Sequence, residues 1–427
     1  MPALPDSTED CGCDDFRSSR RSFLLGAAAT VGAGLTTRMV GDVFTQTAYG
    51  ATGANPNVLV VVSLRGGADG LSMIVPHGDT SYAAARRRTA IPKSSLLEAD
   101  TMFGLHPAFQ PLQQMWRNGT FGAVQSVGLG NPVRSHFAAM EAVEDADPGS
   151  VERRGWINRV VGLIGDQQPQ QAMALGTPMV PTALYGPSPT LSVLKLSKVV
   201  LPGPTDQASV TAHRSAYQSL WGAAPGPLGQ GARTALSTTQ TLNILASDTS
   251  GPDNGAQYPT GDLGKALAET ALTIRAGVGA RVITVDFGGW DMHTYLGTID
   301  GGAMATRLAE LSAALAAFFT DLGLLASTVT VATISEFGRR VGENGTSGLD
   351  HGYGNAMLLL GAGVKGGKVH GRWPGLAPEL LEAGDLAVRT DYRSVLAEVI
   401  GSRFPESDVS QVFPGFAPQT LGAMVPG

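Results

Sequence analysis

A short, mostly β-branched run near residue 60 constrains the fold of this 427-residue chain more than any other feature. Residues 57–64 read N-V-L-V-V-V-S-L, and the segment R-G-G-A-D-G follows at once. A short, nearly continuous β-branched run is typical of a parallel strand that is buried on both faces. In parallel sheets, ligands bind beyond the carboxyl ends of the strands, which is where this glycine-rich segment lies. The run therefore predicts an α/β protein with a ligand site just after residue 64.

Further strands and helices are predicted to alternate along the chain. Strands are expected at residues 120–127, 171–175, 190–196, 281–287, 328–334 and 355–361. Helices are expected at residues 107–118, 135–144, 207–245 with a break at 224–227, 263–276, 303–325 and 392–402. This alternation predicts a three-layer α/β fold in which helices flank a mostly parallel sheet. We expect a single domain over residues 55–427, with a helical insertion at about 205–250.

The first 50 residues have the pattern of an export signal. Arg20 and Arg21 precede F-L-L and an Ala/Gly-rich apolar run at residues 26–35. A positive segment, a short apolar segment and small residues at the end are typical of a secretory signal, and paired arginines mark its twin-arginine (Tat) form. The apolar run is shorter than the ~20 residues that a membrane span needs. We expect export by the Tat translocon to a periplasm, a cell wall or the medium, with cleavage after residue 50 or residue 54.

Cysteine content and charge exclude several classes of function for the exported part. Cys11 and Cys13 both precede the arginine pair, so the exported part has neither a catalytic thiol nor a disulfide scaffold. The net charge is −6 and no basic tract occurs, which argues against nucleic-acid binding. No later segment is an unbroken apolar run of about 18 residues, so we expect no membrane span in the exported part.

Polar residues suited to catalysis or metal binding gather next to the predicted strands. They are Asp69, Arg134, Ser135, His136, Asp291, His293, Glu336, Asp350, His351 and, nearer the end of the chain, His370. Since the carboxyl ends of parallel strands lie along one edge of a sheet, we expect these side chains to share one cleft. Paired imidazole and carboxylate groups suit Zn²⁺, and ligand sets richer in oxygen suit Mg²⁺, Mn²⁺ or Ca²⁺.

Several of these residues also have purely structural explanations. Ser135 begins a predicted helix, where it could be a nucleophile beside an anion held at the helix N-terminus, but N-capping alone explains a serine there. Asp69 followed by Gly70 is also turn chemistry. Glu336 could simply pair with Arg339. No G-x-S-x-G motif surrounds a serine that follows a strand, which counts against an α/β-hydrolase.

Six sequence blocks occur in order along the chain. They are L-R-G-G-A-D-G-L at 64–71, R-S-H-F at 134–137, G-G-W-D-M-H at 288–293, S-E-F-G-R at 335–339, D-H-G at 350–352 and G-R-W-P-G at 371–375. Together they resemble the exported bacterial family called domain of unknown function 1501, over essentially the whole exported part. That family is thought to belong with the alkaline phosphatase and sulfatase-like hydrolases, so the resemblance implies an alkaline phosphatase-like fold.

The resemblance also implies roles for individual residues. Ser135 would be the nucleophile, with His136 beside it, and Arg134 or Arg65 would hold the anionic group. The remaining residues would be metal ligands: Asp350 and His351 for one ion, Asp291, His293 and His370 for another, and Asp69 after the first strand. The step from Asp291 to His293 is two residues, shorter than in the superfamily, and places the second metal in question. A sulfatase mechanism is not expected, because the exported part has no cysteine.

Three hypotheses for function follow. The first is an exported hydrolase of phosphate or related esters that uses one or two divalent metals and acts on a small anionic ester. The alternative is an exported binding or assembly protein with a degenerate, inactive site and no metal. The third is a secreted esterase that uses Ser135 and His136, which is disfavoured because adjacent side chains rarely meet in nucleophile–base geometry.

Overall fold

The computed structural model describes residues 57–164, 168–201, 203–204, 206–246, 248 and 250–427. The predicted export signal, with Arg20 and Arg21, lies outside the described residues.

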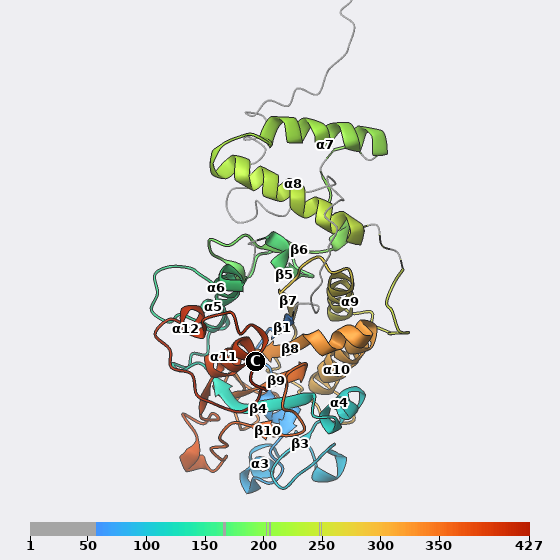
Figure 1. The fold of residues 1–427 in the computed structure, drawn as a ribbon. Helices are drawn as coiled ribbons and strands as arrows, with labels where there is room; N and C mark the ends of the chain where they lie inside the picture. Colours follow the sequence, from blue (N-terminus) through green and yellow to red (C-terminus); the bar gives the residue numbers. More distant parts are fainter. Residues whose placement is uncertain (1–56, 165–167, 202, 205, 247, 249) are drawn as a thin grey trace, which may run out of the picture.

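A nine-stranded sheet forms the centre of the molecule (Figure 1). Its strands in spatial order are β10 (Val369–His370), β4 (Phe121–Gly128), β9 (Asn355–Gly361), β8 (Val329–Ile334), β1 (Val58–Leu64), β7 (Val282–Phe287), β5 (Ala172–Leu175) and β6 (Leu191–Val193), with β11 (Thr390–Asp391) beside β4. Among these strands β9 alone runs antiparallel to its neighbours, and the other pairs are parallel. The predicted α/β class with a mostly parallel sheet is confirmed.

Strand β1 lies between β7 and β8, and all seven of its residues are buried. Its side chains alternate between the two faces of the sheet, so Val60 and Val62 join one hydrophobic core while Leu59 and Val61 join the other. Each fully buried side chain of this kind contributes roughly 1.5–3 kcal/mol relative to an exposed one. A β-branched run is therefore stable at this central position, where both faces of the strand are covered.

Helices cover both faces of the sheet and give the three layers that the sequence predicts. One layer contains η2 (Pro107–Leu112), α4 (Gln113–Arg117), α9 (Asp262–Arg275) and α10 (Ala303–Leu322). The other contains α5 (His136–Asp145), α6 (Trp156–Ile164), α11 (Tyr392–Arg403) and α12 (Val409–Val412).

Short elements connect these layers. After β1 come α2 (Gly70–Met73), β2 (Ile74–Val75), α3 (Thr80–Ala85), η1 (Lys93–Ser95) and β3 (Gly104–Leu105), with β2 and β3 paired antiparallel. Short 3-10 helices lie at η3 (Pro169–Gln171), η4 (Thr182–Leu184), η5 (Leu196–Lys198), η6 (Gly323–Thr328) and η7 (Pro378–Leu380).

Two helices, α7 (Gln207–Trp221) and α8 (Gly226–Ala246), extend beyond the β6 edge of the sheet (Figure 1). They occupy the segment for which a helical insertion is predicted, and the break between them covers residues 222–225. The end of α8 is anchored to the body of the protein, because Leu242 and Leu245 are buried in the same core as α9 and α10.

One helical stretch of the described residues, Ala303–Thr328, is long and apolar enough to cross a membrane by length and composition. It comprises α10 and η6. Half of its most apolar window is buried inside the fold, and Leu308, Leu315 and Phe318 are fully buried in the core. A core helix of a folded protein passes the same test of length and composition.

Candidate metal centre

Four segments bring chemically active side chains to one edge of the sheet. His136 follows β4, Asp291 and His293 follow β7, and the residues after β8 reach the same edge. Because β9 runs opposite to its neighbours, Asp350 and His351, which precede it, also arrive there. Reversal of one strand thus adds a fourth segment to the edge that the parallel strands share.

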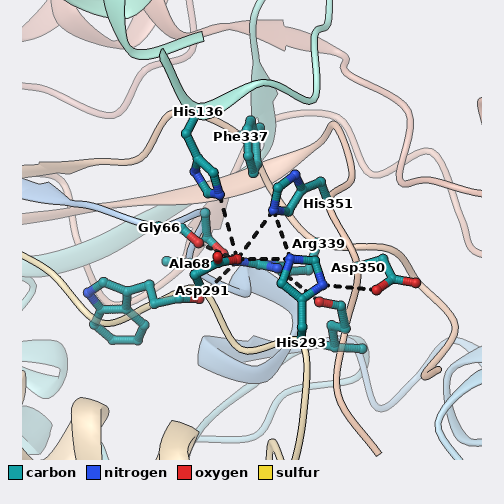
Figure 2. Close-up of polar contacts among 12 residues, drawn as sticks. Gly66, Ala68, His136, Asp291, His293, Phe337, Arg339, Asp350 and His351 are labelled. Carbon is teal, nitrogen blue, oxygen red and sulfur yellow. Dashed lines mark hydrogen bonds and ion pairs between the residues drawn. The ribbon is translucent and has the colours of Figure 1, made fainter. Parts of the chain in front are cut away.

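Three imidazole rings turn a nitrogen toward one carboxylate (Figure 2). The Oδ1 atom of Asp291 lies 3.0 Å from Nε2 of His293, 3.2 Å from Nε2 of His351 and 3.6 Å from Nε2 of His136. The Nε2 atoms of His293 and His351 are 3.0 Å apart. These four residues are named the histidine cluster below.

The second ring nitrogen of each histidine is held by an oxygen atom. The Nδ1 distances are 2.8 Å from His136 to Glu336, 3.0 Å from His293 to Asp350, and 2.8 Å from His351 to the backbone carbonyl of Arg134. Carboxylate and carbonyl oxygens only accept, so a neutral ring that donates from Nδ1 to its oxygen partner would present the Nε2 lone pair to the cluster. Proteins orient metal-ligating histidines in the same way.

An aromatic ring fixes two of these imidazoles. The buried ring of Phe337 lies 4.8 Å from the ring of His136 and 4.7 Å from the ring of His351, and the two imidazoles meet edge-on at 4.4 Å. The Nε2 atom of His136 is buried and has no hydrogen-bond partner among the described residues. A buried nitrogen lone pair of this kind is costly to leave unmatched, so a cation at the cluster would satisfy it.

Asp291 is kept ionised by a buried arginine. Arg339 has a side chain that is 1% exposed, and its Nη2 donates to Oδ1 of Asp291 at 2.6 Å. Burial acts to raise the pKa of Asp291, but the hydrogen bond and the positive charge of Arg339 outweigh it and lower that pKa to about 2. Arg339 also donates to the carbonyls of Gly67 and Leu349, so it is fixed on several sides.

Glu336 ties the cluster to the loop after β1. Besides His136, its Oε1 accepts from the backbone N–H of Gly66 at 2.7 Å, and its Oε2 lies 3.1 Å from the hydroxyl of Ser335. Gly66 has φ +117°, and a Cβ atom there would lie 2.6 Å from the backbone nitrogen of Asp291. Only glycine therefore permits this close approach of the two loops.

Asp350 is held on the other side of the cluster. Its Oδ1 accepts from His293 and, at 3.1 Å, from the side-chain amide of Asn344. The hydrogen bond from His293, followed by that from Asn344, lowers the pKa of Asp350 below its ordinary value. The carboxylate is therefore ionised and able to orient the His293 ring.

Ser135 and Arg134 lie next to the cluster along the chain. Ser135 is the N-cap residue of α5, but its side chain makes no capping hydrogen bond and the residue is exposed. The Nε atom of Arg134 donates to Asp385 at 3.0 Å, and its guanidinium lies 4.5 Å above the ring of Tyr353. The position that the sequence assigns to Ser135 is thus observed, whereas the capping bond that would explain a serine there is not.

Three predicted site residues are not brought to the histidine cluster. Asp69 forms a buried ion pair with Arg86. His370 lies in β10, with its Nε2 atom 2.7 Å from the carbonyl of Lys365. Arg65 is bound by two carboxylates, Asp286 at 2.9 Å and Glu144 at 2.5 Å. Asp69 and Arg65 are held by charged partners elsewhere in the chain, whereas His370 contacts a carbonyl of its own segment.

Four residues of the site were not identified as site residues from the sequence: Arg339, Arg340, Asn344 and Asp385. Arg339 lies inside the block at 335–339, so that block carries a signal for it. Asn344 and Asp385 belong to no block, and their contacts arise from the folding of loops.

Solved structures similar to this chain include the C-terminal periplasmic domain of EcEptC from Escherichia coli, at 10% identity, covering 87% of this chain and 90% of that one with a TM-score of 0.36. The zinc complex of that domain is 9% identical to this chain, and the match covers 73% of this chain and 74% of that one with a TM-score of 0.33. A protein in the alkaline phosphatase superfamily from Vibrio parahaemolyticus is 12% identical, and the match covers 72% of this chain and 60% of that one with a TM-score of 0.31.

These structural likenesses are distant. No curated protein sequence matches the chain. The model of the family described as "Protein of unknown function (DUF1501)" matches residues 113–414, a segment that includes the whole histidine cluster. This match covers well over half of the chain, and the chain therefore belongs to that family.

Proposed function

We propose that this chain is a metal-dependent hydrolase of phosphate or related esters, with the metal held by the histidine cluster. The observation that carries the proposal is the orientation of the three imidazoles: each Nδ1 is bound to an oxygen, and each Nε2 faces the ionised carboxylate of Asp291. Neutral imidazole nitrogens with a carboxylate are the ligands that Zn²⁺ takes in catalytic sites.

The spacing of these atoms fits one ion. Four ligands at 2.0–2.1 Å from a tetrahedral centre lie about 3.3 Å from one another. The separations between Oδ1 of Asp291 and the three Nε2 atoms, and between the Nε2 atoms of His293 and His351, run from 3.0 to 3.6 Å. His136, Asp291 and His351 offer ligand atoms that all lie within 4.8 Å of one another, whereas His293 stands outside this group of three. Three protein ligands leave a fourth position open, as in catalytic zinc sites. Bound there, a divalent metal would supply Lewis-acid stabilisation of negative charge on an ester oxygen.

The chain's own residues supply the remaining functions. Ser135 is proposed as the nucleophile, because its exposed side chain makes no capping bond and lies at the positive end of α5, next to His136. In this reaction the Ser135 hydroxyl loses its proton and its oxygen bonds to phosphorus, while the bond from phosphorus to the ester oxygen breaks and that oxygen takes up a proton to leave as an alcohol. Water then hydrolyses the phosphoserine, which regenerates the Ser135 hydroxyl and releases orthophosphate. Glu336 positions His136, and Arg339 keeps Asp291 in its anionic form.

Export by the Tat translocon remains part of the proposal. It is supported by Arg20, Arg21 and the apolar run that follows them. The proposed substrate is a small anionic ester encountered in a periplasm, at a cell wall or in the medium.

The test combines metal content with hydrolysis. Wild type and His136→Ala are purified without chelator, their zinc, magnesium, manganese and calcium are measured, and both are assayed on a phosphomonoester. We expect His136→Ala to lose metal and activity together. His370→Ala is the matched control, because the structure keeps this histidine outside the cluster and it should retain both. Full activity in His136→Ala would refute the assignment.

One contact favours the alternative function, an exported binding or assembly protein with an inactive site. The buried guanidinium of Arg339 already neutralises Asp291 at 2.6 Å, so the cluster has a counter-ion without a metal. Under this alternative, zinc and chelators leave the melting temperature unchanged. Under the hydrolase proposal zinc raises it, since a ligand that binds only the native state stabilises that state.

A further inference from the structure

We propose that Arg134 and Arg340 together form a binding site for a tetrahedral oxyanion beside the histidine cluster. The inference rests on the proposed function and names the residues that hold the negative charge of its ester substrate: this arginine pair, and not Arg65.

One buried carboxylate organises both arginines. The side chain of Asp385 is 0% exposed. Its Oδ2 accepts from Nε of Arg134 at 3.0 Å, and its Oδ1 lies 3.3 Å from Nε of Arg340. Two guanidinium groups thus share one carboxylate, which leaves the trio with a net positive charge.

Backbone contacts attach the pair to the histidine cluster. The carbonyl of Arg134 accepts from Nδ1 of His351 at 2.8 Å. The backbone N–H of Arg340 donates to the carbonyl of Asp350 at 2.9 Å, and the side chain of Asp350 in turn holds His293. An anion bound by the two guanidinium groups would therefore lie on the side of the cluster formed by His293 and His351.

Each guanidinium keeps donors for a ligand. Arg134 uses Nε and Nη2 for Asp385, and stacks on the ring of Tyr353. Arg340 forms an ion pair with Asp385 through Nε, without a hydrogen bond, and donates from Nη2 to the carbonyl of Ala383 at 2.7 Å. Neither Nη1 has a partner within the described residues, and the two side chains are 35% and 40% exposed. Fixed, partly exposed guanidinium groups with free N–H donors are suited to phosphate-like anions.

Arg65 has the opposite balance of charge. It is held by both Asp286 and Glu144, so this group carries a net negative charge and would repel an anionic ester. We therefore assign the binding of the anionic group to Arg340 together with Arg134, and not to Arg65.

The test measures binding of inorganic orthophosphate to the full exported chain by isothermal titration calorimetry. We expect Arg340→Gln to bind about tenfold more weakly than wild type, because charge-assisted hydrogen bonds are lost. Arg340→Lys keeps a positive charge beside Asp385 but loses the planar fork, and should be intermediate. Arg117→Gln is the matched control: Arg117 is an exposed arginine paired with Glu98, and it precedes β4 at the opposite edge of the sheet.

The outcomes separate this proposal from the proposed function. Unchanged orthophosphate affinity in both Arg340→Gln and Arg134→Lys, with normal melting temperatures, would overturn the arginine site, even if the chain holds metal and hydrolyses esters. Selective loss of orthophosphate binding in Arg340→Gln would support the site, even if the wild type proves metal-free and inactive. In an active enzyme, KM for a phosphomonoester should rise in Arg340→Gln more than kcat falls.

Discussion

Replacing Asp69 by Asn is predicted to destabilise the fold strongly while leaving the metal in place. The side chains of Asp69 and Arg86 are 2% and 0% exposed, and Nη2 of Arg86 donates to Oδ1 of Asp69 at 2.8 Å. Burial acts to raise the pKa of Asp69, but the charge and hydrogen bonds of Arg86 hold it below its ordinary value. Asn removes this charge and leaves the guanidinium buried without its counter-ion.

The size of the effect follows from the other contacts of Arg86. They are the hydroxyl of Ser72 at 3.0 Å, the carbonyl of Val341 at 3.0 Å and the carbonyl of Arg340 at 3.3 Å. These neutral acceptors satisfy N–H donors but do not balance the charge. Breaking a buried pair by removing one partner costs about 3–5 kcal/mol, a large part of the roughly 5–15 kcal/mol that a domain has in total.

The assay is urea unfolding at pH 7 together with metal analysis of the same samples. Arg86→Met completes a double-mutant cycle, because the double variant buries no unpaired charge and should be destabilised by less than the sum of the two single variants. A coupling free energy above about 1 kcal/mol supports the buried pair. A variant Asp69→Asn that is as stable as wild type but has lost its metal would refute the reasoning and return Asp69 to the ligand set.

Three further predictions test other parts of the structure. Glu336→Gln should weaken zinc binding by about 10–100-fold, since the carboxylate that orients His136 is lost; a chelator-competition assay that finds no change would contradict this. Gly66→Ala should lower metal affinity and stability together, because the new Cβ atom would lie 2.6 Å from the backbone of Asp291, and normal values for both would exclude such a clash. Burial lowers the pKa of His106 to about 4, so the unfolded state, in which this pKa is ~6.5, binds more protons between these values. The free energy of unfolding is therefore highest above pH ~6.5, where the ring is neutral in both states, and it should fall by about 2 kcal/mol from pH 7 to pH 5. Urea unfolding of His106→Asn, which can still accept from the N–H of Ala108, should lack this loss, and an equal loss in both proteins would argue against it.

Much of the fold is predictable because the sheet is buried on both faces. The seven predicted strands are all observed, β1, β7 and β8 most clearly, since their β-branched runs fit a strand covered by two helical layers. Helix α6 was not predicted, because Val160, Val161 and Gly162 have low helix propensity. It forms because its apolar side chains are buried against the sheet, a tertiary effect that local sequence does not report.

The candidate site was predicted in part. His136, Asp291, His293, Asp350 and His351 were all named from the sequence, and the structure brings them together. From the sequence, His136 is predicted only as a catalytic residue beside Ser135 and not as a metal ligand. The direction of its ring depends on a hydrogen bond to Glu336, which is 200 positions away in the sequence.

Two predicted site residues, Asp69 and Arg65, lie outside the histidine cluster for one shared reason. Asp69 and Arg65 have charged partners, Arg86 and Glu144, that lie outside the six sequence blocks and approach only in the folded chain. Asp385, which organises the arginine pair, lies in an irregular loop and leaves no pattern in the sequence.

The most direct test of the central claim is zinc titration of the metal-stripped protein, followed by calorimetry. The account predicts about one tightly bound equivalent in the wild type, as a single tetrahedral site requires, and loss of that binding in the variant with His136, His293 and His351 all changed to Ala. Equal zinc binding by this folded triple variant, or no binding by the wild type, would contradict the claim that the histidine cluster is a metal centre.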